Sequence, residues 1–227
     1  MRKMICRVLS GIALLGTFAL HPALAGVTVA GVPFNASEKV GASETALNGA
    51  GVRGVMMLNA YAVGLYLPSK QTTAAEAYQA KGAKRIRVVL LMDAPAERLA
   101  QSLVRGIEKN HGDEVRAKLQ ARLDAFRAAV VSVGTAKVRD VADFDWLPNG
   151  QNDQGGVMRF LLNGKQYGAD IEGEDFYQAV MSIWLGERPT DRALKADLLG
   201  QDAAAAAALP AAAPAETSAA TALPIAP

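Results

Sequence analysis

The chain has little cysteine, histidine or aromatic content, and this narrows the chemistry open to it. It contains one cysteine, Cys6, and two histidines, His21 and His111, among 227 residues, and aromatic residues make up 6%. A disulfide needs a pair of cysteines, and a zinc site usually needs several cysteines or histidines at fixed spacing. We therefore expect no disulfide, no metal site and no cofactor.

The N-terminal segment, residues 1–25, is predicted to be a signal peptide. Basic residues at positions 2, 3 and 7 precede an apolar run over 8–20, and Ala23 and Ala25 supply the small side chains that a signal peptidase reads. The run is too short for a permanent transmembrane segment, although a retained anchor is the alternative. We expect cleavage after Ala25 and a periplasmic or secreted mature protein.

Cleavage would also change the charge of the chain. The full sequence has 24 basic and 22 acidic residues, and the loss of three basic residues leaves 21 against 22, a net charge of −1. A chain so close to neutral gives no sign of a basic surface, so we expect no nucleic-acid partner. Cys6 and His21 would leave with the peptide. His111 would remain, and a single histidine near a helix end is expected to be solvated.

The C-terminal segment, residues 201–227, is predicted to be a disordered tail. It consists almost entirely of alanine and proline, with some serine and threonine and few charges. Such a composition cannot bury a core. Contact with an envelope partner is one role for this tail. Residues 26–200 remain, which is enough for one domain with a sizeable core.

Hydrophobic patterns in this domain predict both strands and helices. Strands are expected at 27–34 (as a short hairpin or an edge strand), 52–58, 61–67, 84–92, 138–147, 157–162 and 166–171, with turns at Asn59-Ala60 and Asn163-Gly164. Helices are expected at 74–80, 96–110, 115–130, 174–185 and 191–199, the last capped by Thr190. This order predicts an α+β fold in which a large antiparallel β-sheet carries a layer of α-helices on one face.

Several segments resemble, in the same order, those of the chalcone isomerase family. Two resemble its paired strands and three its closing helices: 51–55 (Gly-Val-Arg-Gly-Val), 62–67 (Ala-Val-Gly-Leu-Tyr-Leu), 176–180, 184–189 and 194–200. From about Val29 to Gly200 the chain resembles the exported bacterial chalcone isomerase-like proteins. The resemblance implies a large antiparallel sheet, helices on one face, and a ligand cleft between sheet and helices.

The resemblance also singles out Arg53 and Tyr61 as ligand-binding residues. Arg53 matches the family's arginine, and Tyr61 stands where the plant enzymes carry a threonine. A guanidinium can hold a carboxylate or phenolate through two donors, and a phenol can donate to a ligand oxygen. The alternatives are an exposed ion pair for Arg53 and core packing for Tyr61. On one continuous strand the two would share a face, unless the turn at Asn59-Ala60 intervenes.

The other catalytic positions of the plant enzymes are not retained, so no catalytic residue is assigned. The tyrosine, lysine and asparagine of the plant helix align with Leu99, Ser102 and Gly106, and the polar residue of the closing helix aligns with Ser182 or, better, Ile183. This argues against efficient closure of a chalcone.

Three functions remain open for the domain. It could bind a small apolar or anionic molecule, such as a fatty acid, in the cleft. It could be an intramolecular lyase of chalcone-isomerase type acting on an unknown enone, because positioning alone can accelerate an intramolecular reaction. It could also be a non-catalytic structural or interaction module of the cell envelope.

Overall fold

A computed structural model describes residues 26–55, 58–150 and 155–201. The main sheet is built from β3 (Ser37–Val40), β4 (Ser43–Val55), β5 (Leu58–Leu67), β6 (Lys84–Leu90), β9 (Val141–Pro148), β10 (Gly156–Leu162), β11 (Lys165–Gln166) and β12 (Ile171–Glu172). Over these described ranges the strand order is β11-β10-β9-β6-β5-β4-β3, with β12 also paired to β10, and neighbouring strands are antiparallel.

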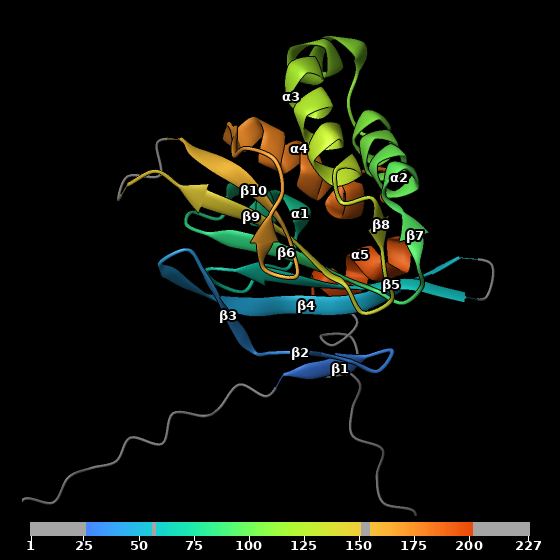
Figure 1. Cartoon of the computed structure of the whole chain (residues 1–227). Coiled ribbons are helices and arrows are strands. Elements are labelled where there is room, and N and C mark those ends of the chain that lie inside the picture. The colour runs from blue at the N-terminus through green and yellow to red at the C-terminus, as the bar shows by residue number, and fades with distance from the viewer. Residues whose placement is uncertain (1–25, 56–57, 151–154, 202–227) are drawn as a thin grey trace, which may run out of the picture.

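Helices cover one face of this sheet. They are α1 (Ala74–Gln79), α2 (Ala96–Glu108), α3 (Asp113–Val131), α4 (Glu174–Leu185) and α5 (Arg192–Leu198). Figure 1 shows α2, α3 and α4 above the sheet, and the hairpin of β1 (Val27–Val29) and β2 (Val32–Phe34) on the opposite side. A small ladder of β7 (Ala94–Pro95) and β8 (Thr135–Ala136) lies beside α2. The predicted α+β fold with one helical layer is therefore confirmed.

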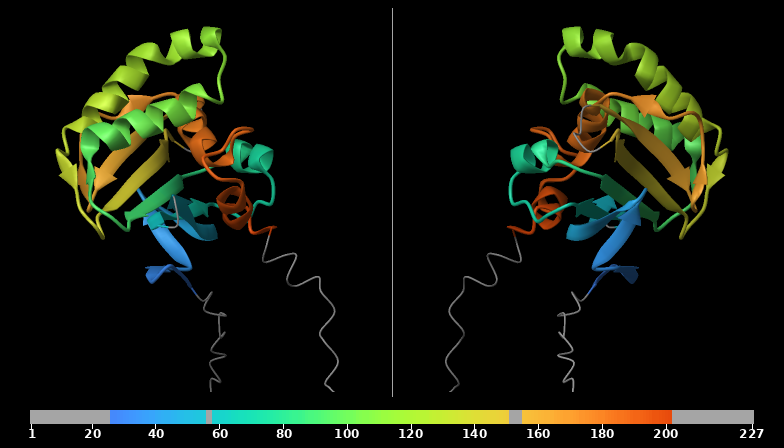
Figure 2. Two further views of the ribbon diagram at one scale, coloured as in Figure 1. Left: turned by 90° about the vertical axis from the view of Figure 1, so that its right-hand side faces the viewer. Right: turned by 90° about the vertical axis from the view of Figure 1, so that its left-hand side faces the viewer.

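Alternation along the central strands separates the two faces. In β6, Ile86, Val88 and Leu90 join the large core beneath the helices, whereas Arg85 and Arg87 face the other way. The side views in Figure 2 show the sheet curling beneath the helical layer. We call the side of the sheet that faces the helices the inner face, and the opposite side the outer face.

Two glycines in β4 allow α5 to lie directly on the sheet. A Cβ at Gly49 would be 2.1 Å from the backbone oxygen of Asp197, and one at Gly51 would be 2.4 Å from the Oδ2 atom of the same residue. The helix itself is capped by Asp191, whose side chain accepts hydrogen bonds from the backbone of Ala193 and Leu194. The prediction of Thr190 as the cap was wrong by one residue.

The predicted turn at Asn59-Ala60 was also wrong. β4 ends at Val55 and β5 begins at Leu58, so both residues belong to β5. The pairing shifts register between Arg53 and Gly54, which leaves Ala60 as an extra residue in β5. Such a β-bulge interrupts the regular alternation that the sequence prediction relied on. The predicted strand at 166–171 is likewise only the two short strands β11 and β12.

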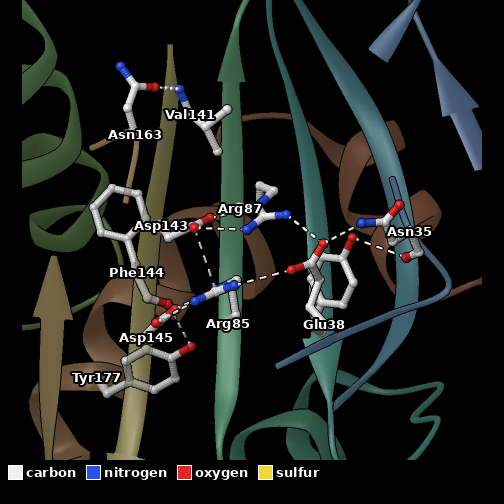
Figure 3. Close-up of polar contacts among 11 residues, drawn as sticks. Asn35, Glu38, Arg85, Arg87, Val141, Asp143, Phe144, Asp145, Asn163 and Tyr177 are labelled. Atoms are coloured by element: carbon white, nitrogen blue, oxygen red, sulfur yellow. Dashed lines mark hydrogen bonds and ion pairs between the residues drawn. The ribbon is translucent and has the colours of Figure 1, made fainter. Parts of the chain in front are cut away.

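A network of buried charges occupies the outer face of β6 and β9 (Figure 3). Arg85 donates to Asp145 through Nε and Nη2 at 2.6 and 2.7 Å, and Arg87 donates to Asp143 at 2.8 and 2.9 Å. Glu38 on β3 accepts a further bond from Arg87 at 2.7 Å. We call these five residues the charge network.

Burial makes the pairing within the charge network important. The side chains of Arg85 and Asp145 are 10% and 5% exposed. Burial alone would lower the pKa of Arg85, but its hydrogen bond to Asp145 and the charges of Asp145 and Asp143 raise it. Removing one member would therefore leave an uncompensated buried charge.

We predict that Arg85→Met lowers the free energy of unfolding by about 3–5 kcal/mol, because Asp145 is left buried without its partner. Burial already raises the pKa of Asp145, and loss of Arg85 removes the main opposing effect. A carboxyl with a raised pKa in the folded state stabilises the fold at low pH and loses that contribution as the pH rises. The deficit of Arg85→Met relative to wild type should therefore shrink on acidification.

Urea unfolding at several pH values measures this effect. The double variant Arg85→Met/Asp145→Leu should recover most of the loss, since no lone charge remains. Asp113→Ala, which breaks the exposed pair with Arg116, is the control and should cost at most about 1 kcal/mol. If Arg85→Met were as stable as Asp113→Ala, the account would be contradicted.

Candidate ligand-binding cavity

A cavity lies between the inner face of the sheet and the helical layer. Its volume is about 70 Å³. The wall is mostly apolar and combines strands β5, β6, β9 and β10 with α2, α4 and the end of α3. It includes Leu90, Leu99, Leu103, Phe144, Phe160 and Ile183. The cleft between sheet and helices that the family resemblance implied is therefore present as a small cavity.

Helix α2 forms the wall of the cavity nearest to solvent. Leu99, Leu103 and Ile107 follow at four-residue spacing and share one face of the helix. Ile107 is fully buried in the core, whereas Leu99 and Leu103 are only partly buried and border the cavity. The C-terminal part of the apolar face of α2 thus packs in the core, and its N-terminal part lines the cavity.

The two residues singled out by the sequence, Arg53 and Tyr61, lie together near this cavity. They are opposite each other on β4 and β5, and the Arg53 guanidinium carbon is 5.9 Å from the centre of the Tyr61 ring. Tyr61 borders the cavity, whereas Arg53 does not. The two residues lie on neighbouring strands rather than on one continuous strand, so the condition of the alternation argument is not met.

The surroundings of Arg53 help to decide whether it is a ligand-binding residue or part of an exposed ion pair. Its side chain is partly buried, and among the described residues no carboxylate pairs with it. The exposed ion pair considered as an alternative is therefore not seen there. A guanidinium over an aromatic face gains a modest attraction and keeps its N–H donors available.

The positions that align with plant catalytic residues fall at or beside the cavity. Leu99, Ser102 and Ile183 border it. Gly106 instead packs against Ile183, and a Cβ there would be 3.0 Å from Ile183 Cγ2. Ser182 faces elsewhere, because its hydroxyl donates to the backbone oxygen of Ala179 at 2.6 Å. Most of these aligned positions therefore lie at the cavity, but their side chains are mostly apolar.

Two residues that the sequence analysis missed bring unpaired polar atoms to this region. Trp184 Nε1 and Thr190 Oγ1 are buried and have no hydrogen-bond partner among the described residues, and both residues border the cavity. Thr190 is fixed beside α4 by its backbone N–H, which donates to Ile183 at 2.9 Å. An unsatisfied buried polar group costs about 1–3 kcal/mol. The sequence held no signal for this, since Thr190 resembled a helix cap.

His111 is partly buried rather than simply solvated. Its Nε2 lies 3.2 Å from Ser182 Oγ, and burial lowers the pKa of the imidazole. This serine is 4% exposed and already donates to Ala179, so the contact positions the histidine and does not activate a nucleophile. Over the described ranges, no cluster of three or more His, Cys, Asp or Glu residues is placed to hold a metal ion.

Comparison with known proteins places the chain in a family. The family model described as chalcone isomerase-like matches residues 26–200. The chain belongs to the chalcone isomerase-like family. None of the curated proteins matches it significantly. In the part of the chain that is described, no helix has the length and apolar character needed to span a membrane.

A solved structure shares the fold of this chalcone isomerase-like domain. It is a fatty-acid binding protein from Arabidopsis thaliana, with a TM-score of 0.58 and 16% sequence identity. The match covers 79% of this chain and 98% of the plant protein. At this identity the likeness establishes the fold alone.

We predict that Thr190→Val raises the free energy of unfolding by about 1 kcal/mol, because it removes an unpaired buried hydroxyl with little change of shape. Thr45→Val is the matched control. The Thr45 hydroxyl is buried and donates to the backbone oxygen of Glu38 at 2.8 Å, so this variant should lose about 1 kcal/mol. Urea unfolding measures both. Equal destabilisation by the two variants would show that Thr190 Oγ1 is satisfied, and would contradict the prediction.

Proposed function

We propose that this protein is an exported binding protein for a small apolar acid of the fatty-acid class. The observation that carries the proposal is an apolar cavity that adjoins Tyr61 and, through it, the guanidinium of Arg53. The hydrocarbon part of the ligand occupies the cavity, and its carboxylate lies at Arg53 and Tyr61. The fold shared with a fatty-acid binding protein supports this assignment.

Arg53 and Tyr61 suit the carboxylate end of such a ligand. No carboxylate of the described residues competes for Arg53, whose donors can form a two-point contact with an acid. Tyr61, which borders the cavity, has a hydroxyl that can act as a further donor. Because both residues are only partly buried, the charged head group would keep some hydration and avoid the cost of full burial.

The size of the cavity limits the hydrocarbon part. A volume of about 70 Å³ is well below the roughly 300–1,000 Å³ of typical small-molecule pockets. Leu99 and Leu103 are partly exposed on α2, and their movement is the simplest way to enlarge the space. A short acid such as octanoic acid should therefore bind more readily than palmitic acid, which needs a larger displacement.

Export is the second part of the proposal and stands on the sequence. The predicted signal peptide over residues 1–25 lies outside the described residues, as does all of the predicted tail over 201–227 except Gln201. Both the envelope location and a partner for the tail are proposals. N-terminal sequencing of the protein from the cell envelope should begin at Gly26, and a start at Met1 would contradict export with cleavage.

An isomerase has no comparable support. The cavity-facing positions that align with plant catalytic residues are Leu99, Ser102 and Ile183. Of these, only Ser102 has a hydrogen-bonding side chain, and it is exposed. We therefore propose binding rather than catalysis.

We predict that Arg53→Gln weakens octanoic acid binding by about tenfold or more, because a hydrogen bond to a charged group contributes about 1.5–3 kcal/mol. Binding of octanol, which has no charge, should change little. Isothermal titration calorimetry with both ligands measures the effect, and Arg192→Gln, an exposed arginine on α5, is the control. If wild type bound octanol as tightly as octanoic acid, the role of Arg53 would be refuted.

Leu103→Trp tests the hydrocarbon site in the same assay. The larger side chain should fill the cavity and abolish binding of both octanoic acid and octanol. Val115→Trp adds the same group to the exposed face of α3 and should bind as wild type does. Unchanged binding in a folded Leu103→Trp protein would place the ligand elsewhere.

A further inference from the structure

Exposed aliphatic side chains gather at one end of the sheet. In the part of the chain that is described, five large apolar residues are exposed: Val27, Leu58, Met92, Val115 and Val138. Single exposed apolar residues are common on protein surfaces. Three of these five, however, lie where neighbouring strands begin or end, and they form what we call the apolar end: Leu58, Met92 and Val138.

Backbone contacts bring these three residues close together. Leu58 begins β5, Met92 follows β6, and Val138 precedes β9, and these strands are adjacent in the sheet. The N–H of Leu91 donates to Ala60 at 3.0 Å, and the N–H of Val138 donates to Asp93 Oδ1 at 2.8 Å. Figure 1 shows the start of β5 and the β7 segment on the same side of the molecule.

The proposed ligand site lies near this same end. Tyr61 lies three residues after Leu58 and pairs with Leu90, which is two residues before Met92. Both Tyr61 and Leu90 border the cavity. Leu99, on the first turns of α2, continues its wall. Residues two or three positions along the chain from Met92 and Leu58 therefore line the cavity.

Two exposed arginines lie beside the apolar end. Arg98 on α2 is exposed, and Arg139 follows Val138 with its guanidinium donating to the backbone oxygen of Gly31. Within the described ranges neither has a carboxylate partner. Of the carboxylates there, Asp93 pairs with Lys137 and Glu97 pairs with Arg127. Asp140 accepts from the backbone N–H of Lys137 and the side-chain amide of Asn163, which leaves its charge in place against those of Arg98 and Arg139. The local balance thus favours an anionic partner.

We propose that the apolar end docks on the surface of an anionic phospholipid membrane. Leu58, Met92 and Val138 would enter the interfacial layer, while Arg98 and Arg139 contact head groups. An anionic lipid surface fits the excess of positive charge beside three exposed apolar side chains, which can enter the interfacial layer. Docking places the cavity against the bilayer, where apolar acids partition.

The test is binding of residues 26–227 to vesicles of phosphatidylglycerol and phosphatidylethanolamine, measured by co-sedimentation. Leu58→Ser/Met92→Ser should lower the partition coefficient by about tenfold or more, from the loss of buried apolar area. Val115→Ser removes an equally exposed apolar group on α3 and should bind as wild type does. Equal losses in both variants, or no vesicle binding by wild type, would overturn the proposal.

The charges are tested in the same assay. Arg98→Gln and Arg139→Gln should each lower the partition coefficient by about fivefold. Added salt should weaken wild-type binding. Lys39→Gln, at the far edge of the sheet on β3, is the control and should have little effect. Binding that neither salt nor these substitutions changed would contradict the role of the arginines.

Two further measurements distinguish membrane docking from ligand binding and from self-association. Octanoic acid binding in solution should survive Leu58→Ser/Met92→Ser, so vesicle binding and ligand binding can fail independently. Intact ligand binding without vesicle binding would overturn docking alone. If analytical ultracentrifugation showed that the double variant only abolished self-association, the apolar end would be an interface between two copies of this chain, and membrane docking would be refuted.

Discussion

The register between β6 and β9 decides what each face of the sheet carries. It places Arg85 opposite Asp145 and Arg87 opposite Asp143 on the outer face, and Ile86 opposite Phe144 on the inner face. A slip of one residue in either strand would exchange the two faces. Arginine would then meet the helices, and the apolar wall of the cavity would face the charge network. The ion pairs therefore specify the register on which the cavity depends.

The same arrangement explains why the cavity is apolar and small. The outer face takes the charges of the central strands, so the inner face offers Val88, Leu90, Phe144 and Phe160 to the helices. Large aromatic side chains fill most of the space between the layers. The rings of Phe144 and Phe160 are stacked, with 5.3 Å between their centroids. Space remains beside Leu99 and Leu103, where α2 is partly exposed. A ligand would enlarge the cavity there rather than at the packed end of α2.

Local patterns in the sequence predicted the helices and strands whose hydrophobic residues follow one clear pattern. The helix predicted at 174–185 coincides with α4, and the strand predicted at 84–92 contains β6. β4 was largely missed, since the prediction began at residue 52 and the strand begins at Ser43. Its polar Thr45 and Asn48 are buried, and Asn48 hydrogen-bonds to Gln71 and Leu198. Contacts so distant in sequence leave no periodic pattern.

The candidate site was only partly accessible from the sequence. The family resemblance identified Arg53 and Tyr61, and the structure brings them together, but through a bulged hairpin that the pattern did not reveal. The aspartate partners of Arg85 and Arg87 lie 60 and 56 residues away along the chain, so the sequence showed only basic residues before an apolar run. The cavity and the unpaired atoms of Trp184 and Thr190 depend on packing and could not be predicted at all.

A crystal structure of the protein with octanoic acid would test the binding account most directly. The account predicts the carboxylate within hydrogen-bond distance of Arg53 or Tyr61 and the hydrocarbon between Leu99, Leu103 and Phe160, in an enlarged cavity. An acid bound elsewhere, such as in the groove between β1 and the residues after α5, would contradict it. So would a cavity that stayed empty and unchanged while the acid was bound.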